Sequence, residues 1–217
     1  MDSTKVEAAV HATSNYVSGT EGYPEDAPEL IKRYESVSSA AVHKPILHLV
    51  PTNPCRVLDV GSGSGRDAAW FAAMGHEVVA VEPTKELRVP AMSLHPSPLI
   101  EWVDDSLPHL AKIVNRRELF DFVSISAVWM HLDAEQRITG MPILASLTRQ
   151  GGTVVMRIRH GPIPPRRRMF EVSAEETIHL ARKSSLSVVQ NIHEESVTEL
   201  DRSVGVSWTR IAFVKRS

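Results

Sequence analysis

The stretch VLDVGSGSG at residues 57–65 decides the fold. Its first four residues are apolar apart from Asp59, as expected for a buried strand of a parallel sheet. The alternating glycines Gly61, Gly63 and Gly65 let the backbone turn tightly and approach a ligand without Cβ contact. A helix predicted directly after them would add its unpaired N–H groups. The stretch therefore predicts a strand, a ligand-binding turn and a helix.

The same alternation of strands and helices continues along the chain. Further strands are predicted at 77–81, 99–103, 120–128, 153–158, 188–192 and 206–214, with helices at 67–74, from Asp133 and from Ser173. This rhythm indicates an α/β fold with a Rossmann-like, mostly parallel sheet and helices on both faces. Such a sheet binds ligands where its strands end, near the point at which the strand order reverses.

Two regions depart from this alternation. Residues 1–50 begin polar and acquire helical spacing from 29 to 49, so we expect an N-terminal helical lead-in or lid before a main domain at 51–217. Between the second and third strands, Pro90 and Pro96 argue against a helix.

Composition excludes several classes of protein. A length of 217 residues suits one domain, and the single cysteine rules out both an intramolecular disulfide and a cysteine-based zinc site. The ten histidines contain no H-E-x-x-H spacing, so no metal is predicted. The chain has no spanning apolar run, and its net charge of −2 offers no bulk attraction to nucleic acid. We expect a cytoplasmic protein whose partner is a small molecule rather than a membrane or nucleic acid; the oligomeric state stays open.

With Glu82 after the second strand, the glycine stretch resembles the first two motifs of the class I S-adenosylmethionine-dependent methyltransferases. The resemblance covers residues 55–160 and includes the acidic pair Asp104–Asp105. It implies S-adenosylmethionine as cofactor and S-adenosylhomocysteine as product. In that family the glycine loop embraces the methionine part of the cofactor, the acid after the second strand holds both ribose hydroxyls, and a later carboxylate receives the adenine amino group.

The resemblance implies a cofactor site built from loops after the first four strands. Glu82 is an acceptor-only side chain and can take both ribose hydroxyl protons. Asp105 is preferred for the adenine amino group, and Asp104 fits almost as well. Asp59 is expected to order the glycine loop or to meet the cofactor amine through water. The predicted set is Asp59, Gly61, Ser62, Gly63, Gly65, Glu82, Pro83, Asp104, Asp105, Ser106, Ser126 and Ala127.

On the substrate side, the end of the fourth strand carries two candidate catalytic residues. Trp129 offers a π-face to a sulfonium or an aromatic substrate, or else packs as an ordinary large side chain. His131 is either a general base or a structural histidine. Arg159 and Arg166 leave the fifth strand and are either solvated or bind an anionic substrate. Tyr16, in the lead-in, completes the predicted substrate set and, like Tyr23, is expected to fold over the cofactor.

The predicted function is in-line methyl transfer from S-adenosylmethionine to an oxygen or nitrogen of a small molecule, with the hypothesis that this acceptor is anionic. The short segments outside the sheet leave no room for a large substrate domain. Two alternatives stay open: a nicotinamide-dependent oxidoreductase of Rossmann fold, and a non-catalytic methyltransferase-like binding protein. The first should carry G-x-G-x-x-G, where this chain has G-x-G-x-G. The second should have lost the cofactor residues.

Overall fold

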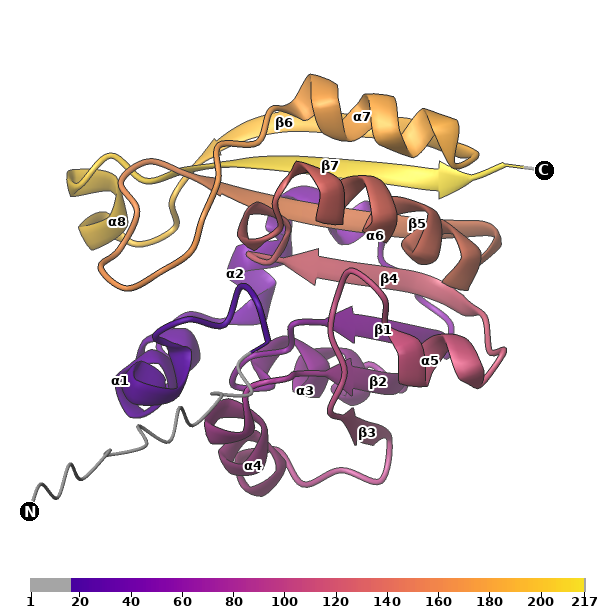
Figure 1. Cartoon of the computed structure of the whole chain (residues 1–217). Helices are drawn as coiled ribbons and strands as arrows, with labels where there is room; N and C mark the ends of the chain where they lie inside the picture. The colour runs from indigo at the N-terminus through magenta and orange to yellow at the C-terminus, as the bar shows by residue number, and fades with distance from the viewer. Residues whose placement is uncertain (1–16, 217) are drawn as a thin grey trace, which may run out of the picture.

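The computed structural model describes residues 17–216, which build one seven-stranded sheet (Figure 1). The strand order is β3-β2-β1-β4-β5-β7-β6, and β7 runs antiparallel to both of its neighbours. The strands are β1 (Arg56–Val60), β2 (Glu77–Val81), β3 (Ile100–Val103), β4 (Phe120–Ser126), β5 (Thr148–His160), β6 (Leu186–Glu195) and β7 (Ser207–Lys215). The predicted α/β fold with a mostly parallel sheet is confirmed.

Helices cover both faces of this sheet. They are α1 (Tyr23–Glu35), α2 (Ser39–His43), η1 (Lys44–Leu49), α3 (Arg66–Ala73), α4 (Lys85–Leu94), α5 (Ala111–Asn115), η2 (Trp129–His131), α6 (Ala134–Leu147), α7 (Ala174–Lys183) and α8 (Glu199–Ser203). None of those in the described part of the chain has the length and apolar character needed to cross a membrane.

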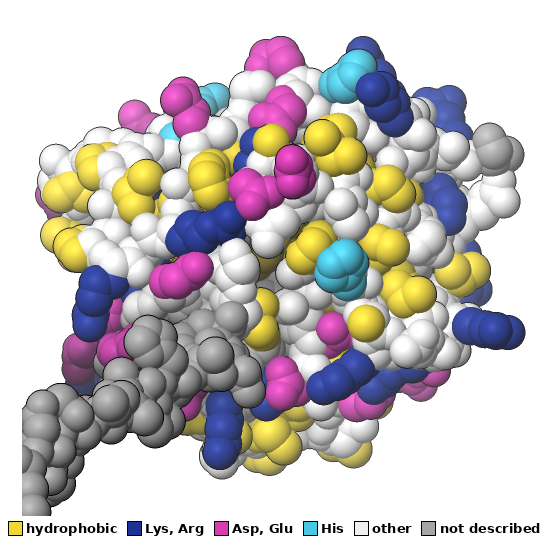
Figure 2. Space-filling view, in the orientation of Figure 1, with side chains coloured by type: hydrophobic (Ala, Val, Ile, Leu, Met, Phe, Trp, Pro, Cys, Tyr) yellow, Lys and Arg dark blue, Asp and Glu magenta, His cyan; other side chains and the backbone are white. Residues whose placement is uncertain are grey.

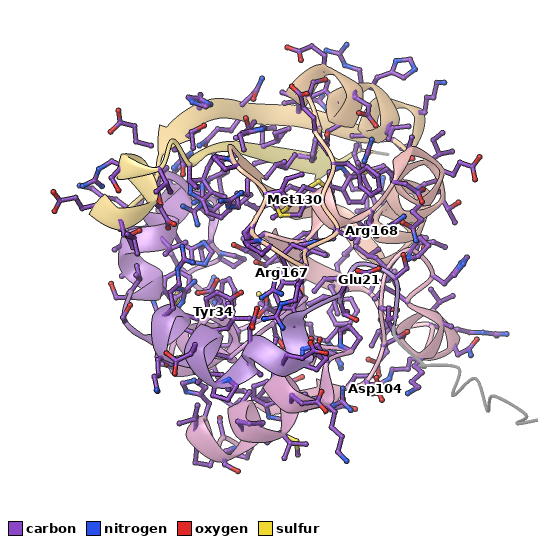
Figure 3. All side chains as sticks on the ribbon, turned by 60° about the vertical axis from the view of Figure 1, so that its left-hand side comes forward. Glu21, Tyr34, Asp104, Met130, Arg167 and Arg168 are labelled. Atoms are coloured by element: carbon purple, nitrogen blue, oxygen red, sulfur yellow. The ribbon has the colours of Figure 1, made fainter. Side chains whose placement is uncertain are left out.

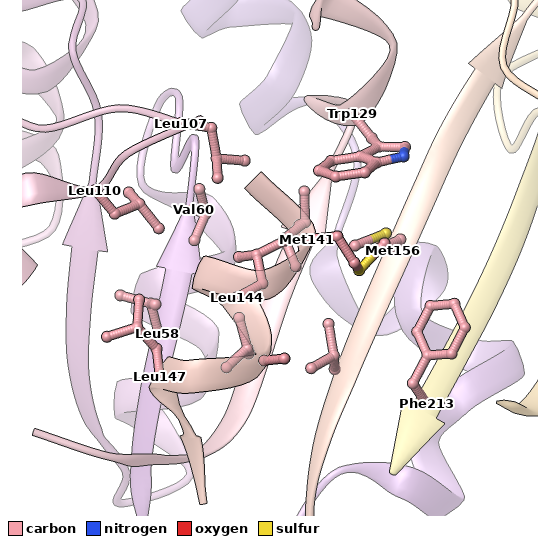
Figure 4. Packing of buried hydrophobic residues seen from close by; sticks show 14 of the residues in the cluster. Leu58, Val60, Leu107, Leu110, Trp129, Met141, Leu144, Leu147, Met156 and Phe213 are labelled. Carbon is pink, nitrogen blue, oxygen red and sulfur yellow. The ribbon is translucent and has the colours of Figure 1, made fainter. Parts of the chain in front are cut away.

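Alternation along the strands divides the core in two. Leu58 and Val60 of β1 point into a large apolar cluster beneath α5, α6 and α7, part of which is shown in Figure 4. Val57, one residue out of phase, points into the smaller cluster beneath α3 and η1. Because successive side chains of a strand alternate between faces, Asp59 lies on the same side as Val57. This places a carboxyl group at the end of β1, where the strand meets the glycine loop.

The helical predictions need two corrections. A helix does form between β2 and β3, with Pro90 inside α4, because Leu87 and Ala91 bury its inner face and one missing N–H is tolerated. The lead-in is three short elements rather than one long helix: α1 ends at Glu35, and Pro45 stands near the start of the 3₁₀ turn η1. The division into residues 1–50 and 51–217 stays a prediction.

Candidate active site

A cavity of about 510 Å³ opens where β1, β2, β4 and β5 end. Ten of the twelve predicted cofactor residues line it: Asp59, Gly61, Ser62, Gly63, Glu82, Pro83, Asp105, Ser106, Ser126 and Ala127. The lead-in covers it, since residues 17–20 and α1 supply further lining side chains. The parallel sheet therefore brings together loops that are far apart in the sequence.

The glycine loop is held tightly against β2. The N–H groups of Gly61 and Ser62 both donate to the carbonyl of Val81, at 2.8 and 2.9 Å. Gly61 has a φ of 72°, and a Cβ there would come within 2.3 Å of the Val128 side chain. Gly65 does not line the cavity: it starts α3, where a Cβ would lie 2.4 Å from the Trp102 ring. The loop therefore needs glycine for its backbone shape and for close packing.

Glu82 joins the glycine loop to the turn after β2. Its Oε2 accepts the N–H of Gly63 at 2.9 Å, and its Oε1 accepts the N–H of Thr84 at 2.8 Å. The residue is only 5% exposed, and burial raises the pKa of the carboxyl group. Each carboxylate oxygen has further acceptor capacity, so a ligand diol in the cavity could donate to both.

The two acidic residues after β3, Asp104 and Asp105, differ in position: one lines the cavity and the other does not. Asp105 lines the cavity, and its carboxylate accepts the N–H groups of Ser106 and, at 2.7 Å, of Lys112 at the start of α5. Asp104 lies outside the cavity, paired with Arg88 at 3.1 Å. In Figure 3 it stands near the lower edge of the view, away from Tyr34 and Arg167. Of the two candidates, the structure places Asp105 at the site.

Two polar atoms at the end of β1 are buried without a hydrogen bond from the described residues: Oδ2 of Asp59 and Oγ of Ser62. Burial, and then the neighbouring Asp67 carboxylate, raise the pKa of Asp59 to about 8. Asp67 is satisfied, since it accepts from Ser39 and Arg66 and pairs with His43 at 3.0 Å. The expected ordering of the glycine loop by Asp59 has no counterpart among the hydrogen bonds of the described residues.

His131 lines the cavity and is held from both sides. Its Nδ1 lies 2.7 Å from the carbonyl oxygen of Arg168, which can only accept, so Nδ1 carries the proton. Its Nε2 then accepts the hydroxyl of Tyr23, at 2.9 Å. Burial lowers the pKa of His131, in keeping with a neutral ring. The structure thus presents a Tyr23–His131 pair at the cavity wall.

Trp129 does not reach the site. Its side chain is fully buried in the larger core cluster, beside the apolar residues shown in Figure 4. Of the two interpretations, the structure fits ordinary packing of a large side chain rather than contact with a sulfonium or substrate, because the 3₁₀ turn η2 directs residue 129 inward and residue 131 toward the cavity.

The three consecutive arginines after β5, residues 166–168, form ion pairs and hydrogen bonds with other parts of the chain. Arg166 and Arg167 both pair with Asp26 of α1, Arg167 at 2.8 Å. Arg167 also stacks on the Tyr23 ring, 4.2 Å from its centroid, and lines the cavity, whereas Arg166 does not. Figure 3 shows Arg167 beside the lead-in. Arg168 pairs with Asp133 and donates to the carbonyl of His131.

Of the predicted substrate residues, Arg159 alone lines the cavity; Tyr16 lies outside the described residues. Sequence reasoning missed several other lining residues, among them Tyr34, Arg33, Asp201 and Trp208, whereas Arg157 belongs to the arginine segment that the sequence already singled out. The missed residues come from α1, α8 and β7, and no local motif marks them. Only the strand pairing, which sets Arg159 opposite Trp208, brings the last of them to the site.

No group of three metal-binding side chains occurs among residues 17–216. Acidic and basic side chains are interspersed over the face seen in Figure 2. On the face shown there, the surface has no broad area of one sign of charge.

Comparison with known families gives two matches. Residues 57–152 match a family described as "Methyltransferase domain", and residues 2–94 match the protein-L-isoaspartate(D-aspartate) O-methyltransferase family. The first covers β1 to the beginning of β5, which is the part that carries the glycine loop, Glu82 and Asp105. No curated protein matches the chain.

Solved structures share the fold at low sequence identity. The 1,6-didemethyltoxoflavin N1-methyltransferase of Burkholderia thailandensis, solved with 1,6-didemethyltoxoflavin and S-adenosylhomocysteine, aligns with a TM-score of 0.66 and 20% identity over 89% of this chain and 87% of its own. A TehB-like methyltransferase from Corynebacterium glutamicum gives 0.63 and 18%, over 89% and 100%. The magnesium protoporphyrin IX methyltransferase of Synechocystis, with S-adenosylmethionine bound, gives 0.58 and 15%, over 90% and 80%.

Proposed function

We propose that the chain is a class I S-adenosylmethionine-dependent methyltransferase and that it methylates an oxygen or nitrogen of a small molecule, since residues 57–152 match a methyltransferase domain and the fold agrees with it. The observation that carries this proposal is Glu82, buried at the cavity and already held by the N–H groups of Gly63 and Thr84. A carboxylate fixed in this way fits the vicinal hydroxyls of the cofactor ribose.

The residues around Glu82 fit the rest of the cofactor. We expect Asp105 and Ser106, which line the cavity, to contact the adenine. Asp59 and Ser62 hold buried polar atoms without partners, which suits the ammonium group of the methionine part. When bound, the cofactor would supply the transferable methyl group on its sulfonium.

The Tyr23–His131 pair is suited to accept the proton that a methylated hydroxyl or amine loses. The neutral His131 can take the Tyr23 proton on Nε2 while the Tyr23 oxygen takes the proton of the acceptor. Its Nδ1 keeps its proton throughout and donates it in a hydrogen bond to the Arg168 carbonyl, which keeps the ring oriented. The protein must also hold nucleophile and methyl carbon in line about 3–3.5 Å apart, and this positioning can supply several kcal/mol.

The test is cofactor binding followed by turnover. S-Adenosylhomocysteine should raise the melting temperature, with about 2.7 kcal/mol of stabilisation at 100 times its Kd, whereas a nicotinamide dinucleotide should not. Incubation with methyl-labelled S-adenosylmethionine and a metabolite library should then transfer label to a small molecule. Stabilisation by the dinucleotide alone would favour the oxidoreductase, and cofactor binding without transfer would favour a binding protein.

A further inference from the structure

Arg157 is a cation buried at the cavity, and no carboxylate of the described residues pairs with it alone. It lies on β5, lines the cavity and is only 7% exposed. Its guanidinium stacks on the Trp208 ring at 3.7 Å. Its side chain makes no hydrogen bond with residues 17–216, and its Nε is buried and unsatisfied. An unpaired buried charge is costly, so its retention points to a ligand.

The nearest acid cannot neutralise it. Glu194 of β6 lies 3.8 Å from Arg157 but is taken by Arg210, which reaches one carboxylate oxygen at 2.7 Å and the other at 3.3 Å. Arg210 is fully buried and lies directly opposite Arg157 in the antiparallel register of β5 and β7. Two guanidinium groups therefore share one carboxylate, which leaves one positive charge facing the cavity.

The surroundings of Arg157 form an arginine lobe, which we define as the cavity wall made by Arg157, Arg159, Trp208 and Val42. Arg159 is half-buried and lines the cavity, and among residues 17–216 its side chain donates only to the carbonyl of Pro162. Trp208 and Val42 supply apolar surface. This lobe offers two positive charges beside an apolar wall.

We propose that the arginine lobe binds the carboxylate of the methyl acceptor, which is therefore a monocarboxylate with an apolar or aromatic body. This rests on the proposed function. A guanidinium fork matches the two oxygens of a carboxylate, and Trp208 holds the Arg157 fork in one plane. A dianion fits less well, because Asp201 also lines the cavity and would repel a second negative charge.

The arginine lobe and the proposed ribose ligand lie on different strands of the sheet. The ribose ligand Glu82 follows β2, whereas Arg157 lies on β5, three strands away in the order β2-β1-β4-β5. With strands spaced roughly 4.8 Å apart, the two backbones are roughly 14 Å apart. The affinity of Arg157→Met for S-adenosylhomocysteine then distinguishes the carboxylate of the acceptor from that of the cofactor.

The test uses the full chain saturated with S-adenosylhomocysteine. Benzoate is then titrated in as the probe, and its Kd is measured by calorimetry. Benzoate should bind the wild type and the control Arg182→Met, a change on the surface of α7, with equal affinity. Arg157→Met should weaken benzoate roughly tenfold to a hundredfold, the effect of losing a charge-assisted pair. Arg157→Lys should fall between, since it keeps the charge and loses the fork. Inorganic phosphate should not compete.

Several outcomes would overturn the proposal: no benzoate binding to the wild type, equal binding to Arg157→Met, or tighter binding of phosphate. If Arg157→Met bound S-adenosylhomocysteine more weakly but benzoate with unchanged affinity, Arg157 would be assigned to the cofactor instead. Arg157→Met should melt no lower than the wild type, because an apolar side chain replaces an unpaired charge; a clear drop would indicate a structural role. If the wild type bound benzoate but not S-adenosylhomocysteine, the proposed function would fail and the anion site would stand.

Discussion

Replacement of Glu82 by glutamine tests the cofactor site at its centre. Both oxygens of the carboxylate already accept one backbone N–H, from Gly63 at 2.9 Å and from Thr84 at 2.8 Å. Glutamine has one oxygen, so its NH₂ must face one of these two donors and cannot accept from the ribose. One charge-assisted acceptor is lost, which costs about 1.5–3 kcal/mol and corresponds to roughly a tenfold to hundredfold rise in Kd.

Calorimetric titration with S-adenosylhomocysteine measures this change directly. Glu77→Gln is the matched control, because Glu77 begins β2, the strand that Glu82 follows, and its side chain is 67% exposed. The affinity of this variant for S-adenosylhomocysteine should stay at the wild-type value. The fold should survive Glu82→Gln, since burial already disfavours the charged carboxylate and raises its pKa. Unchanged affinity in a folded Glu82→Gln protein would show that this carboxylate does not hold the ribose.

Three further results are expected. His131→Asn should lower turnover by about 10²–10⁴-fold while cofactor affinity is kept, and because burial lowers the pKa of His131, wild-type turnover should persist below pH 6.5; a near-normal rate would make the histidine structural. The pKa of Asp59 is raised from 3.8 to about 8 in the folded state, so the folded protein binds this proton more tightly than the unfolded chain. The free energy of unfolding of the wild type therefore falls as the pH rises between these two values. The melting temperature of Asp59→Asn should fall less than that of the wild type between pH 5 and 8. Asp26→Asn leaves the buried Arg167 guanidinium unpaired and should cost about 1–2 kcal/mol in denaturant unfolding, where no change would mean that α1 is held by other contacts.

The central part of the site could be predicted from sequence because its signals are local. The glycine loop and Glu82 each follow a strand directly, so the strand prediction also places them at the same edge of the sheet. The choice between Asp104 and Asp105 was harder, because a shift of one residue decides which side chain faces the cavity.

The acceptor side could not be predicted because it depends on contacts between distant segments. Tyr23 meets His131 across 108 residues, and Arg157 meets Trp208 through the antiparallel pairing of β5 and β7. Both interpretations of Trp129 stayed open for a related reason: a single 3₁₀ turn determines whether a residue after β4 points into the core or into the cavity.

The ion pairs of Asp26 in α1 with Arg166 and Arg167 in the loop after β5 also determine when the site can form during synthesis. Asp26 leaves the ribosome early, yet its partner Arg167 follows 141 residues later. Until β5 and its loop have been translated, α1 has no docking surface on that side, and contacts that close such long loops form slowly. The nascent chain can therefore assemble β1 to β4 with the glycine loop first, and α1 covers the cavity from this side only after Arg167 has emerged.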